Sequence, residues 1–226
     1  EPRPEYQVRR TTSLESCFRH SHWHHHRLRT FKAMMRCNLP AARIDAFANC
    51  GSNCHVVKLE GVDGVRLAGV CCHDRLCEPC QRVRANTIRT NAAAALKDKE
   101  VRFLTLTLKQ NQNPLREQIK RLKTSFRSLL RRQAIRNSIT GGLIFLEVKR
   151  SQDLKRWHPH LHVIVTGGYI EQKTLATEWY AVTGDSYIVD IRAVRDTADL
   201  GAYVTKYVTK PVTHDVASNP AHFDEY

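Results

Sequence analysis

The segment from Trp157 to His162 carries histidines at alternate positions, His158, His160 and His162. The apolar residues that follow predict a strand, in which residues two apart project from the same face. His160 and His162 can then bind one divalent ion side by side. Glu147 is the one acid of the preceding predicted strand, and an antiparallel pairing would bring its carboxylate beside them. Two imidazoles and one carboxylate leave coordination positions open, and they suit manganese or magnesium with a phosphate ligand.

A second candidate group lies further along the chain, where Tyr203 and Tyr207 are four residues apart and so are Lys206 and Lys210. Residues at this spacing share one face of a helix. We expect the core to take a separate apolar stripe that begins at Leu200 and to leave the tyrosines exposed. A phenolic oxygen can attack a phosphodiester and hold the cleaved end covalently, while a lysine offsets the growing charge. Beside the histidine pair, this helix predicts phosphodiester cleavage.

All eight cysteines lie within the first 80 residues, and several are closely spaced. Short pairs about 20 residues apart are typical of a structural zinc site, because a tight turn brings two thiolates onto one tetrahedral ion. Five cysteines compete for four positions here, and the nearby His55 and His73 are possible substitutes. The five candidates are Cys50, Cys54, Cys72, Cys77 and Cys80.

The elements that must position these groups follow from the periodicity of the sequence. We expect an irregular basic stretch at first, with a possible helix near Leu28–Met35. A metal module follows, with a hairpin that starts at Cys54, and then a helix rich in Arg and Ala. From Val101 onwards the predicted order is strand, helix, strand, strand, helix, strand, helix. This order indicates an α+β fold with a central antiparallel sheet, helices on one side, and a small zinc-binding module before it.

The clearest predicted helix has Asn113 as its cap and Pro114 in its first turn. Apolar residues repeat at helical spacing from Leu115 to Leu130, and the other faces carry eight cations against one acid, Glu117. Such cations either face solvent or contact phosphate groups, and their excess is larger than solubility needs. The cations are Arg116, Lys120, Arg121, Lys123, Arg127, Arg131, Arg132 and Arg136.

Composition supports a nucleic-acid partner. The 226 residues include 36 Lys or Arg and 22 Asp or Glu, which gives a net charge of +14. A surplus of this size points to a polyanion, most commonly DNA or RNA. The 42% of hydrophobic residues excludes intrinsic disorder, and the sequence holds no apolar run long enough for a membrane span.

Three segments in this order resemble the motifs of HUH-superfamily rolling-circle initiators. They are Phe103-Leu-Thr-Leu-Thr-Leu108, His158-Pro-His-Leu-His162 and Tyr203-x2-Lys206-Tyr207-x2-Lys210. The cluster from Cys72 to Cys80 resembles the cysteines that precede this domain in plasmid replication proteins and related transposases. The resemblance covers residues 37–212, and it rests on the combination of motifs.

The resemblance implies an RRM-like sheet and a nuclease that nicks single-stranded DNA through a tyrosine. The products would be a 5′-phosphotyrosine and a free 3′-hydroxyl, with no ATP needed for the cut. It assigns His160 and His162 as metal histidines, Glu147 as the source of a third ligand and Tyr207 as the nucleophile. Single-tyrosine plasmid initiators usually carry Glu four residues before the nucleophile, whereas this chain has Tyr203. The departure favours the two-tyrosine group, in which two tyrosines alternate.

We therefore expect a basic N-terminal arm, a zinc-binding module with a connecting helix, an HUH endonuclease domain and a tail. Expected partners are single-stranded DNA, from an origin or element end in a hairpin or unwound duplex, and a host or fused helicase, with no membrane. The expected location is the prokaryotic cytoplasm, with the nucleoid or a plasmid. The four parts span residues 1–45, 46–98, 99–212 and 213–226.

Initiation of rolling-circle replication of a plasmid or phage is the leading interpretation, and three alternatives stay open. One is a rolling-circle transposase with the same chemistry. Another is a non-catalytic, zinc-dependent nucleic-acid binder whose histidines form a further structural site. The last is a metal-dependent hydrolase that activates water with the histidine pair and forms no bond to DNA.

Overall fold

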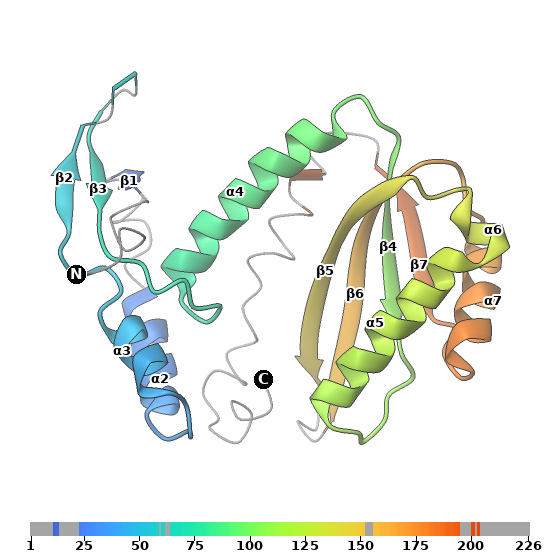
Figure 1. Ribbon diagram of the computed structural model, residues 1–226, viewed down its shortest axis with the longest axis horizontal. Coiled ribbons are helices and arrows are strands. Elements are labelled where there is room, and N and C mark those ends of the chain that lie inside the picture. Colours follow the sequence, from blue (N-terminus) through green and yellow to red (C-terminus); the bar gives the residue numbers. More distant parts are fainter. Residues whose placement is uncertain are drawn as a thin grey trace. The chain divides into compact units, whose positions relative to one another are not determined.

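The structure is a computed structural model (Figure 1). Its described residues up to Arg84 form one compact unit, and those from Ala85 onwards form a second. None of the described helices combines the length and apolar character that a bilayer span requires. The described residues are 11–13, 23–58, 60–61, 64–151, 156–194, 200, 201 and 203.

The first unit holds a three-stranded sheet and two helices. Strand β3 (Arg66–Ala68) lies between β1 (Thr11–Ser13) and β2 (His55–Val57), antiparallel to both. The predicted hairpin after Cys54 is therefore present as β2 and β3. The possible helix near Leu28–Met35 is present as α2, which is longer (Trp23–Met34). The rest of the predicted irregular arm is wrong where it contains the start of α3 (Ala41–Ala48).

Helix α4 (Glu78–Leu96) runs from the first unit into the second. Its interior contains no Gly, and its one Pro, Pro79, stands in the first turn, where the missing N–H costs no hydrogen bond. The predicted helix over this stretch is confirmed. The predicted domain division at 98 and 99 lies just after α4 ends and stays a prediction.

The second unit is built on a four-stranded antiparallel sheet in the order β5-β6-β4-β7 (Figure 1). Its central strands are β6 and β4, and β5 is an edge strand. The α+β architecture with a central antiparallel sheet is thus confirmed. The strands are β4 (Val101–Thr107), β5 (Gly141–Arg150), β6 (Trp157–Thr166) and β7 (Val189–Ala193).

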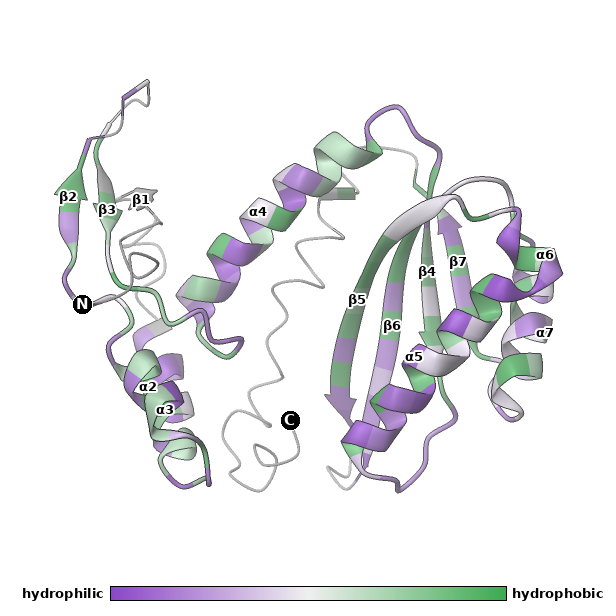
Figure 2. Cartoon of the chain, in the orientation of Figure 1, coloured by the Kyte–Doolittle hydropathy of each residue, from purple (hydrophilic) through white to green (hydrophobic). Residues whose placement is uncertain are grey.

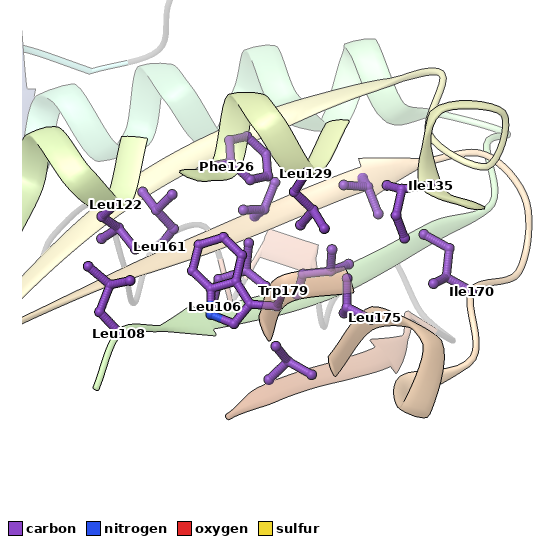
Figure 3. Close-up of a cluster of buried hydrophobic side chains, with 14 residues drawn as sticks. Leu106, Leu108, Leu122, Phe126, Leu129, Ile135, Leu161, Ile170, Leu175 and Trp179 are labelled. Carbon is purple, nitrogen blue, oxygen red and sulfur yellow. The ribbon is translucent and has the colours of Figure 1, made fainter. Parts of the chain in front are cut away.

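Helices cover one face of this sheet and enclose the main core (Figure 3). Helix α5 (Leu115–Arg131) buries Leu122, Phe126 and Leu129 against it. The short α6 (Gln133–Arg136) and α7 (Gln172–Thr183) complete the layer, and α7 ends at Gly184 in the left-handed conformation, φ 79°.

The indole of Trp179 ties α7 to the sheet. Its side chain is fully buried, and Nε1 donates a 2.9 Å hydrogen bond to the Thr107 carbonyl oxygen. Burial of this large ring contributes several kcal/mol, since truncating a buried Trp to Ala costs about 3–5 kcal/mol. The bond holds the end of β4, which carries part of the site described below.

Two sequence-based details of this layer are wrong. The cap of α5 is Pro114, not Asn113, whose side chain makes no capping bond. The helix also ends at Arg131, because Arg132 has extended backbone and only the single turn of α6 follows it.

The expectation of helices on one side is wrong as well, because the other face of the sheet has its own core. Ala92 and Leu96 of α4 pack there with Ile164 of β6 and with Leu200. This second core covers one end of that face, and the polar residues of the candidate site occupy its continuation.

Gly142 of β5 marks a close approach between the edge strand and β6. A Cβ at this position would lie 2.1 Å from the Ile164 carbonyl oxygen, well inside contact distance. Only glycine fits here without displacing β5.

Candidate active site and metal centre

Five side chains of three neighbouring strands meet on the sheet face opposite α5. In the antiparallel register, His160 lies opposite both Glu147 and Thr107, and His162 lies opposite Thr105. Alternation along the strands places these residues on the same face as Ile164. The predicted neighbourhood of the histidines and the Glu147 strand is therefore present. We call His160, His162 and Glu147 the histidine–glutamate cluster.

His162 and Glu147 form the buried centre of this cluster. His162 Nε2 lies 2.8 Å from Glu147 Oε2, and both side chains are 6% exposed. Lys149 Nζ lies 3.1 Å from the same oxygen. A carboxylate this buried is stable in its charged form only with such compensation.

His160 is held as a neutral imidazole. Burial is the largest cause, followed by electrostatic repulsion from His158 and Lys149, and together they lower its pKa to about 3. Burial also lowers the pKa of His158, whose ring centroid lies 4.3 Å from that of His160. A neutral imidazole can give its lone pair to a metal ion at pH 7 without first losing a proton.

Threonines hold the Nδ1 atoms of both histidines. Thr107 Oγ1 lies 3.0 Å from His160 Nδ1, and Thr105 Oγ1 lies 3.2 Å from His162 Nδ1. A hydroxyl can accept a proton from Nδ1 or donate one to it, so each threonine suits both tautomers. With Nδ1 engaged, a metal ion would bind through Nε2, which in His162 contacts Glu147, and each threonine orients its ring.

The donor atoms are of a mixed kind that divalent metal ions accept, two imidazole nitrogens and one carboxylate. These atoms lie further apart than the ligand atoms of a closed metal site, since the centroids of the two imidazole rings are 6.2 Å apart. Among the described residues, only a set of four cysteines has all its potential ligand atoms within 4.8 Å of one another. The arrangement is therefore open.

The cysteine cluster consists of Cys50, Cys72, Cys77 and Cys80. Cys50 lies 3.6 Å from Cys77 and 3.5 Å from Cys80, and Cys72 lies 3.7 Å from Cys80, measured between sulfurs. Tetrahedral coordination with Zn–S bonds of about 2.3 Å requires sulfurs about 3.8 Å apart. The cluster is thus compatible with a structural metal such as zinc. Cys54 is exposed and lies outside it.

Local turns bring these four residues together. Cys50 directly follows α3, while Cys77 and Cys80 flank and enter the first turn of α4. Between them His73 adopts φ +56°, and the Asp74 backbone N–H lies 3.4 Å from Cys72 Sγ. An N–H directed at a sulfur stabilises the thiolate form that a metal ion binds.

The thiols share protons with one another. Hydrogen bonds from Cys72 and then Cys77 lower the pKa of Cys50 to about 7, and bonds from Cys50 and other thiols hold the pKa of Cys80 well below its usual range. The pKa values of Cys72 and Cys77 are raised, because these thiols keep the protons that they donate to Cys50. A dication would displace those protons and bind all four thiolates.

Tyr203 stands at the edge of the histidine–glutamate cluster. Its ring stacks on Phe103 at 3.6 Å between centroids, and the centroid of His162 lies 6.3 Å away. The hydroxyl oxygen is buried. The ring is packed on the second core, so the expectation that this tyrosine is left exposed is wrong. Lys206, Tyr207 and Lys210 lie outside the described residues.

Sequence reasoning missed three residues of this site. Thr105 and Thr107 contact the histidines, and Lys149 contacts Glu147. The signal was present in the strand Val101–Thr107, where threonines alternate with buried leucines. Polar residues at alternate positions of an otherwise apolar strand indicate a polar site on one face.

The described residues thus hold two candidate metal sites of different chemistry, a histidine–glutamate face on an antiparallel sheet and, in the other unit, a cysteine cluster. Comparison with known families makes the assignment specific. The chain belongs to the Replication protein family (Rep_1), whose model matches residues 65–225. The predicted resemblance to replication initiators is thereby confirmed.

Curated relatives from several bacteria agree with this assignment. "Protein rep" of Streptococcus pneumoniae is 27% identical over 207 residues, which cover 81% of this chain and 65% of that protein. "Protein rep" of a Bacillus species is 30% identical over 44% of this chain and 36% of its own length. A Staphylococcus aureus "Protein rep" is 28% identical over 62% of this chain and 69% of its own.

The chain thus spans about two thirds of the pneumococcal relative and about a third of the Bacillus one. No solved structure matches it.

Proposed function

We propose that the protein is a site-specific single-stranded DNA endonuclease and strand transferase that initiates rolling-circle replication of a plasmid or phage. The observation that carries this proposal is the histidine–glutamate cluster beside Tyr203, in a chain of the Replication protein family. Its substrate would be an origin strand exposed in a hairpin or unwound duplex. A host or fused helicase would then extend the opening, in the cytoplasm.

In the proposed reaction, the phenolic oxygen of Tyr207 bonds to the scissile phosphorus, and the bond between phosphorus and the 3′ oxygen breaks. The phenol loses its proton, and the 3′ oxygen takes one up and leaves as a hydroxyl. The 5′ end stays on the enzyme as a phosphotyrosine. The reaction replaces one phosphoester bond with another and so retains its energy. The same protein can therefore later rejoin the ends.

His160, His162 and Glu147 would hold a manganese or magnesium ion. When bound, such an ion supplies Lewis-acid polarisation of a phosphate oxygen. The protein's own contribution is to keep His160 neutral and the rings oriented by Thr105 and Thr107. Lys206 and Lys210 would offset the charge that develops on the phosphate. A zinc ion in the cysteine cluster would have a structural role only.

We further propose that Tyr207 makes the first cut and Tyr203 the second. The stacking of Tyr203 on Phe103 and the burial of its hydroxyl oxygen support this order. Tyr203 must leave this packing before its oxygen can reach a phosphate, which suits a later step.

A covalent adduct tests the proposal. The wild-type protein is incubated with Mn²⁺ and a pool of single-stranded oligonucleotides of randomised sequence, and SDS-resistant protein–DNA bands are recorded. We expect an adduct in the wild type and in Tyr203→Phe, and none in Tyr207→Phe.

Cleavage without an adduct would replace the tyrosine mechanism with hydrolysis by activated water. DNA binding with no cleavage of any pool would favour the non-catalytic alternative. Tyr169→Phe is the matched control, because Tyr169 is 76% exposed and belongs to neither candidate group.

A further inference from the structure

The exposed side of α5 carries five cations in a single row. Successive residues of a helix are 100° apart, so these five fall within an arc of about 80°. The buried residues Leu122, Ser125 and Leu129 lie on the opposite side of the helix. We call these cations the α5 row: Arg116, Lys120, Lys123, Arg127 and Arg131.

The charge of the row is not neutralised within the described part of the protein. No described residue forms an ion pair with any of the five, whereas Arg121 and Arg132 beside the row pair with Asp185 and Glu178. Figure 2 shows hydrophilic residues along the length of α5. One acid, Glu117, stands at its margin.

The row extends over fifteen residue steps, which is about 22 Å of helix. At its end lies a surface hollow lined by Arg131, Arg132, Gln133, Ala134 and Glu178. Duplex DNA carries one negative charge per about 1.7 Å of its axis, so a straight row of this length can meet several phosphates.

The row and the histidine–glutamate cluster lie on opposite sides of the same sheet. Leu122 and Leu129 of α5 pack on the face that contains Leu161, whereas His160 and His162 project from the other face of β6. The thickness of a helix and a sheet, roughly 15–20 Å, separates the two surfaces. One phosphate cannot contact both.

We propose that the α5 row binds the phosphate backbone of a second DNA segment, double-stranded and flanking the strand that is cut. The proposal rests on the proposed function only in taking DNA as the partner. A straight row of cations along one helix face matches the regular charges of a phosphate backbone, so we expect binding that depends little on sequence.

The test removes three charges of the row, in Lys120→Gln/Lys123→Gln/Arg127→Gln. Affinity for a 30-bp duplex of arbitrary sequence is measured by fluorescence anisotropy over a range of salt concentrations. All proteins in this measurement carry Tyr207→Phe and no divalent metal is added, so that no cleavage occurs and no chelator removes zinc from the cysteine cluster. Each lost phosphate contact lowers the slope of log K against log salt by about 0.9, so we expect a decrease of about 2–3. Affinity at low salt falls at least about tenfold.

The matched control removes the same charge elsewhere, in Lys97→Gln/Lys99→Gln/Lys173→Gln, whose three lysines are exposed. We expect this variant to keep most of the wild-type slope. Equal losses in both variants would overturn the proposal, since they would show a response to net charge alone.

Adduct formation on a single-stranded 10-mer is the second readout. We expect the row variant to retain it, because the cluster lies on the other face. A parallel loss of duplex affinity and of 10-mer adduct would overturn the separation of the surfaces. If no protein forms an adduct, the proposed function fails, while the anisotropy result still decides the role of the row.

Discussion

The cysteine cluster and the histidine–glutamate cluster gather their ligand atoms in different ways. The four sulfurs lie at spacings that tetrahedral zinc requires, and they can fill all four positions. The histidine–glutamate cluster offers three donors at looser spacing, and its nearest partners are side chains that orient the rings. A closed site of this kind stabilises a fold, whereas an open site can admit a phosphate oxygen.

Removal of the metal from the cysteine cluster is expected to have the largest effect. In Cys77→Ser the free energy of structural zinc, about 10–16 kcal/mol in small zinc peptides, is largely lost, so the unit up to Arg84 should unfold. Amide-resolved NMR of the zinc-loaded and chelator-treated wild type measures the same change. If the spectra retain dispersed signals for this unit after zinc is removed, the cluster has no structural role.

Glu147→Gln should have the next largest effect, and on the other cluster alone. The amide keeps the shape and can bond to His162, but it removes the charge that would bind a divalent ion. We expect adduct formation to fall at least about a hundredfold, with zinc content and melting temperature near those of the wild type. An unchanged adduct yield would exclude Glu147 as a ligand.

Replacement of Thr107 by Val tests whether the open cluster depends on its orienting partners. Loss of the hydroxyl frees His160 Nδ1, and outer partners of metal ligands typically contribute 10–100-fold to metal affinity. We expect Mn²⁺ affinity, measured by calorimetry, to fall by about that factor in Thr107→Val and to recover in Thr107→Ser. Equal affinities in the Val and Ser variants would assign Thr107 to packing only.

Cys54→Ser should have the smallest effect. The thiol is exposed and outside the cysteine cluster, so we expect a stability change within about 0.5 kcal/mol and the same zinc content as the wild type. Metal analysis beside a melting curve measures both. Loss of one equivalent of zinc would instead return Cys54 to the ligand set.

Local signals predicted the elements of the second unit well. The strands Val101–Thr107 and Trp157–Thr166 were predictable because β-branched and apolar residues dominate them, and Gly184 marks the end of α7. The break of α5 at Arg132 was not predictable, because Arg132 is a good helix former and its extended backbone is imposed by its surroundings.

Which residues join each cluster depends on turns and strand pairing, which the spacing of residues in the sequence does not determine. Cys54 lies four residues from Cys50 and Cys72 lies five residues from Cys77, so both spacings suited a zinc ligand. The structure places Cys72 in the cluster, directly before the turn at His73 with its positive φ. The contacts of Thr105 and Thr107 depend on strand register, which emerges only when β4 pairs with β6. The position of Glu147 was predictable because its strand directly precedes the histidine strand, and consecutive strands joined by a short connection pair antiparallel.

Gly142 makes the edge strand β5 sensitive to mutation at a point far from the candidate site. Five strand steps, about 17 Å, separate Gly142 from Glu147, and a ladder of hydrogen bonds transmits displacement along β5. Any side chain at 142 collides with the Ile164 carbonyl and pushes this strand outward. A random mutant library screened for loss of the proposed nicking activity should therefore yield hits at Gly142, which lies outside the histidine–glutamate cluster.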